Sequence, residues 1–381
     1  MVKVAVLGAG AGGYTYAADL TLLGHTVNLF ELPALKKNIQ PVLKYGGIEI
    51  LEDMAEPGPE RAGFAKINQV TTDIKETVRG VDIVLNPVPA NYYETFAKTA
   101  APYLEDGQVV VTLGKGGGSV MWYNAVKAMG IKKDVTFGEL NTLGYGSTIM
   151  GRVLGEEYSN KVRIEGPAVN TIGGAFPGKN TPKIVDAFTS LYPKGTRNVR
   201  PALNIIEVML VDYNAISHPP PIICNAGRIE SGDKTFHMFG KDVCTESVCR
   251  VMEKIDRERM AIGKALGIDS KTFEEECKEI LFGKPMTIYN VIHNPYLEIC
   301  EGPFNLKTRY LTEDIPFGLV TFSSLGDMLG TPTPVCDALI AIASILNDED
   351  YRKTGRTVQK LGINPSWTVE QLNRYLKNGE I

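Results

Sequence analysis

The chain has 381 residues, of which 44% are hydrophobic, and its formal net charge is −4. This length predicts about two domains, and the small negative charge argues against nucleic acid or an anionic membrane as a partner. No stretch is apolar enough to span a bilayer and the N-terminus lacks the apolar core of a signal peptide, so we expect a cytoplasmic protein that acts on small molecules, with a homodimer as one option.

The N-terminal stretch has the pattern of a dinucleotide-binding βαβ unit. A short apolar run at residues 2–7 is followed directly by Gly8, Gly10 and Gly13. In such a turn the first glycine allows the tight bend, the second lets the backbone approach a pyrophosphate, and the third lets the helix pack against the strand. We therefore expect these glycines to bind a cofactor, with a glycine-rich turn in a nucleotide-free fold as the alternative.

Glu31 stands directly after a second apolar run, residues 26–30. An acid at this point can accept hydrogen bonds from the hydroxyls of the adenosine ribose, and its charge would repel the 2′-phosphate of NADP. We therefore expect NAD as the cofactor. Lys36 and Lys37 follow closely enough to weaken this preference, so NADP stays open.

Three later apolar runs, residues 81–86, 108–113 and 134–137, predict further buried strands of a doubly wound, mostly parallel sheet. Ligands of such sheets bind outside the carboxyl ends of the strands. Residues just after these ends are therefore candidates to line the nicotinamide half of the cofactor, although an ordinary loop role is an equal alternative. These candidates are Pro89, Ala90, Gly116 and Asn141.

The second half of the chain shows apolar side chains at helical spacing and almost no strand-like alternation. We predict an α/β dinucleotide-binding domain at residues 1–196 and an all-α substrate domain at residues 197–381. Helices are expected at residues 202–217, 245–266, 270–281 and 334–346.

Asn214 and His218 are four residues apart and therefore lie on one face of the first of these helices. Three prolines follow at residues 219–221. Because proline disfavours helical conformation in the residue before it, the helix should stop or kink at His218 and present the imidazole at a helix end. From the residues alone, this histidine is either a structural helix end or a group that transfers protons.

Two stretches, in this order, carry a family resemblance that covers nearly the whole chain: Asn214-Ala-Ile-Ser-His218-Pro219 and Arg309-Tyr-Leu-Thr-Glu-Asp314-Ile-Pro-Phe-Gly. Together with the N-terminal glycine pattern, they resemble the octopine/nopaline (opine) dehydrogenase family. The resemblance implies a Rossmann domain followed by a helical domain of the 6-phosphogluconate dehydrogenase type. It also implies NAD(P)H-dependent reductive condensation of an amino acid with an α-keto acid, usually pyruvate, and the reverse reaction.

The same resemblance assigns roles to individual residues. His218 matches the catalytic histidine, with Asn214 beside it, and Arg309 matches the arginine that binds the keto-acid carboxylate. Asp314 matches an acidic partner that could orient either the arginine or the histidine. These residue types suit the chemistry, because histidine titrates near neutral pH and an arginine fork holds a carboxylate bidentately.

Residues 139–145 resemble a further family stretch, which makes Asn141 and Thr142 candidates for substrate binding. The family pattern predicts proline where Gly144 stands and often an arginine where Thr148 stands. This departure bears on the substrate rather than on the reaction.

Two other classes of protein stay open. One is a two-domain dehydrogenase acting on a hydroxy acid, such as a ketopantoate reductase or glycerol-3-phosphate dehydrogenase relative, although the lysine motif of those families is missing from the second half. The other is a non-catalytic NAD-binding regulator. Neither a metal site nor a disulfide framework is predicted, because the six cysteines lack C-x-x-C spacing and have no histidine at a ligand interval.

Overall fold

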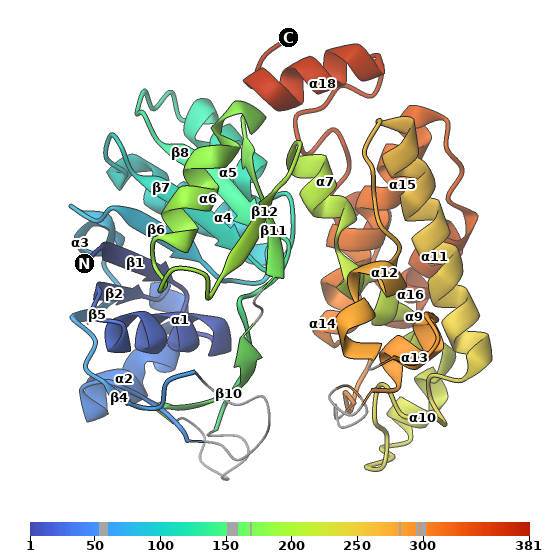
Figure 1. The fold of residues 1–381 in the computed structure, drawn as a ribbon, viewed down its shortest axis with the longest axis horizontal. Helices are drawn as coiled ribbons and strands as arrows, with labels where there is room; N and C mark the ends of the chain where they lie inside the picture. The colour runs from blue at the N-terminus through green and yellow to red at the C-terminus, as the bar shows by residue number, and fades with distance from the viewer. Residues whose placement is uncertain (53–59, 151–158, 168–169, 282, 295–296, 298–301) are drawn as a thin grey trace. The chain divides into compact units, whose positions relative to one another are not determined.

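The computed structural model describes residues 1–52, 60–150, 159–167, 170–281, 283–294, 297 and 302–381 (Figure 1). The chain divides into two compact units, one of Met1–Met209 with Asn373–Ile381 and the other of Leu210–Leu372. The domain boundary between residues 196 and 197 stays a prediction. In the structure, the first helix after that boundary belongs to the first unit, and so does the C-terminal end of the chain.

The first unit is built on an eight-stranded sheet with the strand order β12-β11-β8-β7-β6-β1-β2-β5. All neighbouring pairs are parallel except β11 with β8, so the sheet is mostly parallel, as predicted. The five strands expected from the sequence are present as β1, β2, β6, β7 and β8. The bounds are β1 (Lys3–Leu7), β2 (Thr26–Phe30), β5 (Gln69–Thr71), β6 (Ile83–Asn86), β7 (Val109–Leu113), β8 (Thr136–Leu140), β11 (Asn170–Phe176) and β12 (Asn198–Pro201).

Eight α-helices and four short 3-10 turns of the described chain belong wholly or partly to this unit. The α-helices are α1 (Ala11–Leu22), α2 (Gln40–Tyr45), α3 (Ile74–Val78), α4 (Tyr93–Ala100), α5 (Gly118–Ala128), α6 (Thr181–Thr189), α7 (Ile205–Leu210) and α18 (Val369–Asn378). The 3-10 turns are η1 (Pro33–Ile39), η2 (Ala90–Tyr92), η3 (Ala101–Tyr103) and η4 (Gly178–Asn180).

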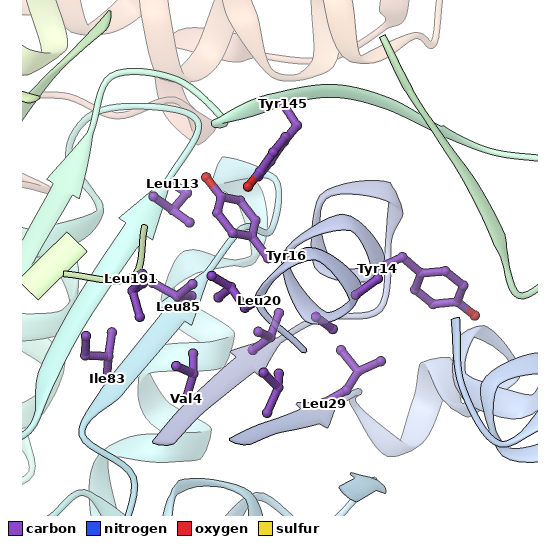
Figure 2. Packing of buried hydrophobic residues seen from close by; sticks show 14 of the residues in the cluster. Val4, Tyr14, Tyr16, Leu20, Leu29, Ile83, Leu85, Leu113, Tyr145 and Leu191 are labelled. Carbon is purple, nitrogen blue, oxygen red and sulfur yellow. The ribbon is translucent and has the colours of Figure 1, made fainter. Parts of the chain in front are cut away.

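Helices cover both faces of the large sheet. Neighbouring residues of a strand point to opposite faces, so their contacts identify the helix on each face. On β8, Phe137 stacks on Trp122 of α5, whereas Gly138 lies against Ile184 of α6. α1 and α6 share one face, since their apolar side chains join a single cluster with β1, β6 and β7; Figure 2 shows the α1 part of this cluster. The sheet is therefore doubly wound, as predicted.

A second, four-stranded sheet, which the sequence analysis did not anticipate, has the order β4-β3-β10-β9. Its strands contact α1, and their apolar residues belong to the same core cluster, so α1 is buried between two sheets. The bounds are β3 (Ile48–Ile50), β4 (Gly63–Ala65), β9 (Tyr145–Ile149) and β10 (Lys161–Pro167).

In the second unit, every regular element among the described residues is helical, as predicted. The helices are α8 (Tyr213–Ser217), α9 (Pro219–Cys224), α10 (Ala226–Glu230), α11 (Glu246–Ala265), α12 (Phe273–Glu276), η5 (Lys278–Leu281), α13 (Ile288–Ile292), α14 (Arg309–Thr312), η6 (Ile315–Leu319), α15 (Val320–Leu329), α16 (Pro334–Asn347) and α17 (Tyr351–Thr354). Within the described chain, no helix is long and apolar enough to cross a membrane.

Two of the four predicted helices of this half are wrong in extent. The helix expected at residues 202–217 is split into α7 and α8, because the side chain of Asp212 accepts the N–H of Ala215 and starts a new helix. The helix expected at residues 270–281 is α-helical only over α12, which a Thr272–Glu275 capping box begins. The other two are confirmed as α11 and α16.

Candidate functional site

Three glycines of the glycine-rich turn in the first unit have different structural roles. Gly8 has a positive φ of 88° and donates its N–H to the carbonyl of Phe30 over 2.8 Å. A Cβ at Gly13 would lie 1.8 Å from the carbonyl oxygen of Gly8, so this glycine lets α1 approach β1. A Cβ at Gly10 would meet nothing within 4 Å, and this residue stands at the N-terminus of α1, where backbone N–H groups favour an anion.

The carboxylate of Glu31 is buried at the end of β2 and joins that strand to the glycine turn. Its Oε2 accepts the N–H of Ala9 over 3.0 Å and the side-chain amide of Asn38 over 2.9 Å, while Oε1 accepts the N–H of Leu32 over 2.8 Å. Open space at Gly10 and a carboxylate at the end of β2 fit the pyrophosphate and the adenosine ribose of a dinucleotide. The residues present therefore fit the cofactor that the sequence predicts.

The remaining loop candidates of the first unit have structural contacts of their own. A Cβ at Gly116 would lie 2.7 Å from the Cα of Met209, so this glycine packs against α7. Asn141 accepts the N–H of Ile172 through Oδ1 over 3.0 Å and thereby supports the start of β11. Cofactor or substrate contacts of these two stay predictions, as they do for exposed Pro89, buried Ala90 and half-buried Thr142.

A contact with α1 explains why glycine stands at position 144, where the family pattern predicts proline. Its N–H donates to the hydroxyl of Tyr16 on α1 over 2.9 Å, and a Cβ at this position would lie 2.5 Å from that hydroxyl oxygen. Proline has no N–H to donate. The departure from the family pattern therefore accompanies a tyrosine of α1 that uses this contact.

In the second unit, the structure brings His218 and Asp314 together. Nδ1 of the imidazole lies 2.7 Å from Oδ2 of the carboxylate, and the two side chains are 14% and 5% exposed. His218 links α8 to α9, and the prolines occupy the first turn of α9, where a missing N–H leaves no bond unmade. The kink predicted at this histidine is thus present, and Asp314 contacts the imidazole. That Asp314 orients the histidine stays a prediction.

The backbone around Asp314 is unusual. Asp314 precedes η6, a π-helical turn, and such turns occur frequently at functional sites. Two aromatic rings flank the imidazole: the edge of Tyr310 at 4.7 Å between centroids, and Phe239 at 6.1 Å. The sequence pattern marks neither ring as functional, because neither has a group that can transfer protons near neutral pH or bind a carboxylate by its charge.

Arg309 pairs with Glu313, an acid that the sequence pattern did not mark. Its Nε lies 3.3 Å from Oε2 of Glu313, the residue that follows α14, and the arginine side chain is 60% exposed whereas that of Glu313 is 8% exposed. Asn214 is half-buried, and its backbone carbonyl accepts the N–H of His218 over 3.0 Å. Among the described residues no three side chains of the ligand types are grouped to hold a metal ion.

Comparisons with known proteins match both parts of the chain. Residues 201–347 match the model of the α-helical domain of NAD/NADP octopine/nopaline dehydrogenases, and residues 3–125 match that of the N-terminal domain of NAD-dependent glycerol-3-phosphate dehydrogenase. An opine dehydrogenase of Arthrobacter sp. (strain 1C) is 34% identical over 94% of each chain. Protein ocs of Agrobacterium tumefaciens (strain Ach5) is 25% identical over 98% of this chain and 99% of its own.

The fold has a counterpart among solved structures. An octopine dehydrogenase structure described as a complex with NADH and L-arginine superposes with a TM-score of 0.77 at 20% identity, covering 100% of this chain and 99% of the other.

The geometry of the glycine turn predicts that one Gly→Ala substitution affects mainly stability and another affects mainly cofactor binding. Gly13→Ala should lower the free energy of unfolding of the first unit by about 1–3 kcal/mol, because its methyl group would overlap the Gly8 carbonyl. Gly10→Ala should change stability by no more than about 0.5 kcal/mol and yet raise the Kd for NADH by about tenfold or more, because its methyl group would enter the space open to the pyrophosphate. Urea unfolding and fluorescence titration with NADH measure the two effects, and a reversed pattern would contradict the assignment.

Proposed function

The chain belongs to the octopine/nopaline (opine) dehydrogenase family, and on this premise we propose that His218, Asp314 and Arg309 carry out its reaction. It is an NAD(P)H-dependent oxidoreductase of the CH–NH group that condenses an amino acid with an α-keto acid reductively, and catalyses the reverse reaction. We propose pyruvate as the keto acid, which is also named with an octopine dehydrogenase of the same fold.

The observation that carries the assignment is the 2.7 Å contact between Nδ1 of His218 and Oδ2 of Asp314. An ionised carboxylate can only accept a hydrogen bond, so it holds the proton of the ring on Nδ1 and turns Nε2 into the group that exchanges protons. It also stabilises the imidazolium that forms when Nε2 takes a proton. The flanking ring of Tyr310 restricts the orientation of the imidazole further.

His218 thereby serves the two proton transfers of the condensation. The amino acid must lose a proton from its ammonium group before its nitrogen can attack the keto carbon. The carbonyl oxygen must gain two protons to leave as water, and one of them comes from the attacking nitrogen itself. A neutral Nε2 accepts the first proton, and the resulting imidazolium donates one to the leaving oxygen. Asn214, one turn before the histidine, contributes its backbone carbonyl to the position of His218.

Arg309 is proposed to bind the carboxylate of the keto acid. A guanidinium offers five N–H donors in a planar fork, so it can hold a carboxylate bidentately and orient the adjacent keto carbon. The exposed position of Arg309 leaves it accessible to a ligand from solution, and Glu313 supplies a nearby carboxylate that restricts the side chain. Asn141 and Thr142 stay proposed substrate contacts.

The first unit supplies the proposed cofactor contacts, Gly8, Gly10, Gly13 and Glu31, with Pro89, Ala90 and Gly116 toward the nicotinamide half. When bound, NADH supplies the hydride. Because Glu31 carries a buried negative charge near the ribose position, we propose that the enzyme prefers NADH to NADPH.

We also propose a reducing compartment such as the cytoplasm as its location. The five cysteines within the described chain are free thiols, and Cys300 lies outside it. Burial raises the pKa of the Cys249 thiol to about 11, and it raises those of Cys244 and Cys336 as well, so these thiols stay protonated and weakly reactive near neutral pH. A homodimer stays part of the proposal.

The reaction itself is tested by NADH oxidation with pyruvate and each amino acid in turn. We expect oxidation that requires both substrates together, and a product whose mass equals the sum of the two substrates minus one oxygen atom. Oxidation with a keto acid alone would support a hydroxy-acid dehydrogenase instead. NADH binding without oxidation under any substrate pair would support a regulator.

Loss of the imidazole should abolish most of the catalysis. His218→Ala should fold, bind NADH and lower kcat about 100-fold or more, the usual scale for a general acid–base group. Asp314→Asn should lower kcat by about tenfold or more, because an amide can stabilise the wrong tautomer of the ring. His237→Ala removes an exposed histidine of the same unit and should leave kcat unchanged. A His218→Ala enzyme within threefold of the original would return this histidine to a structural role.

Loss of the arginine fork should weaken the use of keto acid selectively. Arg309→Leu should lower kcat/KM for the keto acid about 30- to 1000-fold, the equivalent of about 2–4 kcal/mol for a charge pair deprived of one partner. Arg309→Lys should recover only part of this loss, because lysine keeps the charge without the fork. The Kd for NADH should stay nearly unchanged, since the cofactor contacts belong to the other unit.

Arg257→Leu is the matched control, because Arg257 is also exposed and also pairs with a glutamate one turn away, Glu253. It should leave all constants unchanged. A raised Kd for NADH in Arg309→Leu, with the KM for keto acid unaffected, would make Arg309 a cofactor or structural contact.

A further inference from the structure

The negative charge of Glu31 is stabilised by neutral groups. In the described chain, its hydrogen-bond donors are two backbone N–H groups, those of Ala9 and Leu32, and the side-chain amide of Asn38. A carboxylate that is only 2% exposed needs such donors, because burying an ionised group without them is costly. Asn38 is the only side chain among these donors, and nothing in the sequence pattern of the dinucleotide fingerprint requires it.

Asn38 is itself fixed by a second contact. The hydroxyl of Tyr14 donates to the backbone carbonyl of Asn38 and thereby joins α1 to η1. Figure 2 shows the ring of Tyr14 leaving α1 on the side away from Tyr16, so the two tyrosines hold different neighbours of the helix. Burial and the charge of Glu31 raise the pKa of Tyr14, which keeps its hydroxyl protonated as a donor.

The η1 segment that contains Asn38 also carries two positive charges, opposite in sign to that of Glu31. Lys36 and Lys37 are exposed on η1, immediately before Asn38. Their positive charges would attract a 2′-phosphate, whereas the carboxylate of Glu31 would repel it. The balance between the two depends on whether the carboxylate is held in place.

We propose that Asn38 is a positioning residue that sets the cofactor specificity of this enzyme by holding the carboxylate of Glu31 toward the adenosine ribose, with Tyr14 fixing Asn38 in turn. The proposal rests on the proposed role of Glu31 in binding that ribose. A carboxylate has about four lone-pair sites, and the three N–H donors occupy three of them, which leaves Oε1 with capacity for a ribose hydroxyl. Without the amide of Asn38, the carboxylate loses its orientation and repels a 2′-phosphate less. The attraction of that phosphate by the lysines of η1 then has more effect on cofactor binding.

The test measures Kd values for NADH and for NADPH by fluorescence titration of the enzyme without substrates, together with kcat/KM for both cofactors. Asn38→Leu should raise the Kd for NADH about tenfold, on the scale of one hydrogen bond to a charged group, and should lower the preference for NADH over NADPH by a similar factor. Asn38→Gln keeps an amide and should restore part of the preference. Tyr14→Phe should shift the preference in the same direction by a smaller factor. The KM for keto acid should not change in any of them.

Two controls separate positioning from general destabilisation. Asn68→Leu removes a side-chain amide that donates to Asn28 over 2.8 Å in the same unit, and it should leave both Kd values unchanged. In a background of Glu31→Ala, Asn38→Leu should have no further effect on the preference, because a positioning residue acts only through the group that it positions. An effect of Asn38→Leu of equal size with and without Glu31 would overturn the proposal.

The failures of the two ideas are distinguishable. If Glu31→Ala leaves the ratio of the two Kd values unchanged, the proposed role of Glu31 is wrong. If Glu31→Ala narrows the ratio while Asn38→Leu does not, only the role of Asn38 is wrong. Melting temperatures of all variants show whether an altered Kd comes with a loss of folding.

Discussion

The close approach of α1 to β1 is the constraint on which the first unit depends. With a Cβ position 1.8 Å from the Gly8 carbonyl, Gly13 permits a distance between helix and strand that no other residue allows. The short distance places the N-terminus of α1 at the carboxyl end of β1, where an anion can be bound by backbone N–H groups. It also lets α1 bury apolar side chains against two sheets at once.

Polar side chains of α1 hold parts of the chain that are distant in sequence. Tyr16 accepts the N–H of Gly144, and Asp19 accepts hydrogen bonds from Arg61 at 2.7 Å and from the hydroxyl of Tyr145 at 2.5 Å. Burial and the charge of Asp19 raise the pKa of Tyr145, so its hydroxyl stays a donor. Buried polar groups of this kind must all find partners, and they therefore specify one arrangement of the strands around the helix.

In the second unit, prolines mark the point where the chain bends at His218. The three prolines after His218 begin α9, and the imidazole stands at the junction of two short helices. Asp314 reaches it from the start of a π-helical turn, 96 residues later. A contact between two side chains this far apart in sequence needs support on both partners, and the two helix junctions provide it.

The sequence by itself determined what local chemistry dictates: the βαβ unit with its glycines, the buried strands, the two-part plan, and the bend at His218 that proline imposes. The order of two motifs also predicted that His218, Asp314 and Arg309 act together. Only the tertiary structure decided that Asp314 contacts the histidine while Arg309 contacts Glu313, because residues five apart can face different neighbours depending on how the turn between them is wound. The contact of Asn38 with Glu31 was hidden for the same reason, since a hydrogen bond across a loop depends on side-chain direction and leaves no periodic pattern in the sequence.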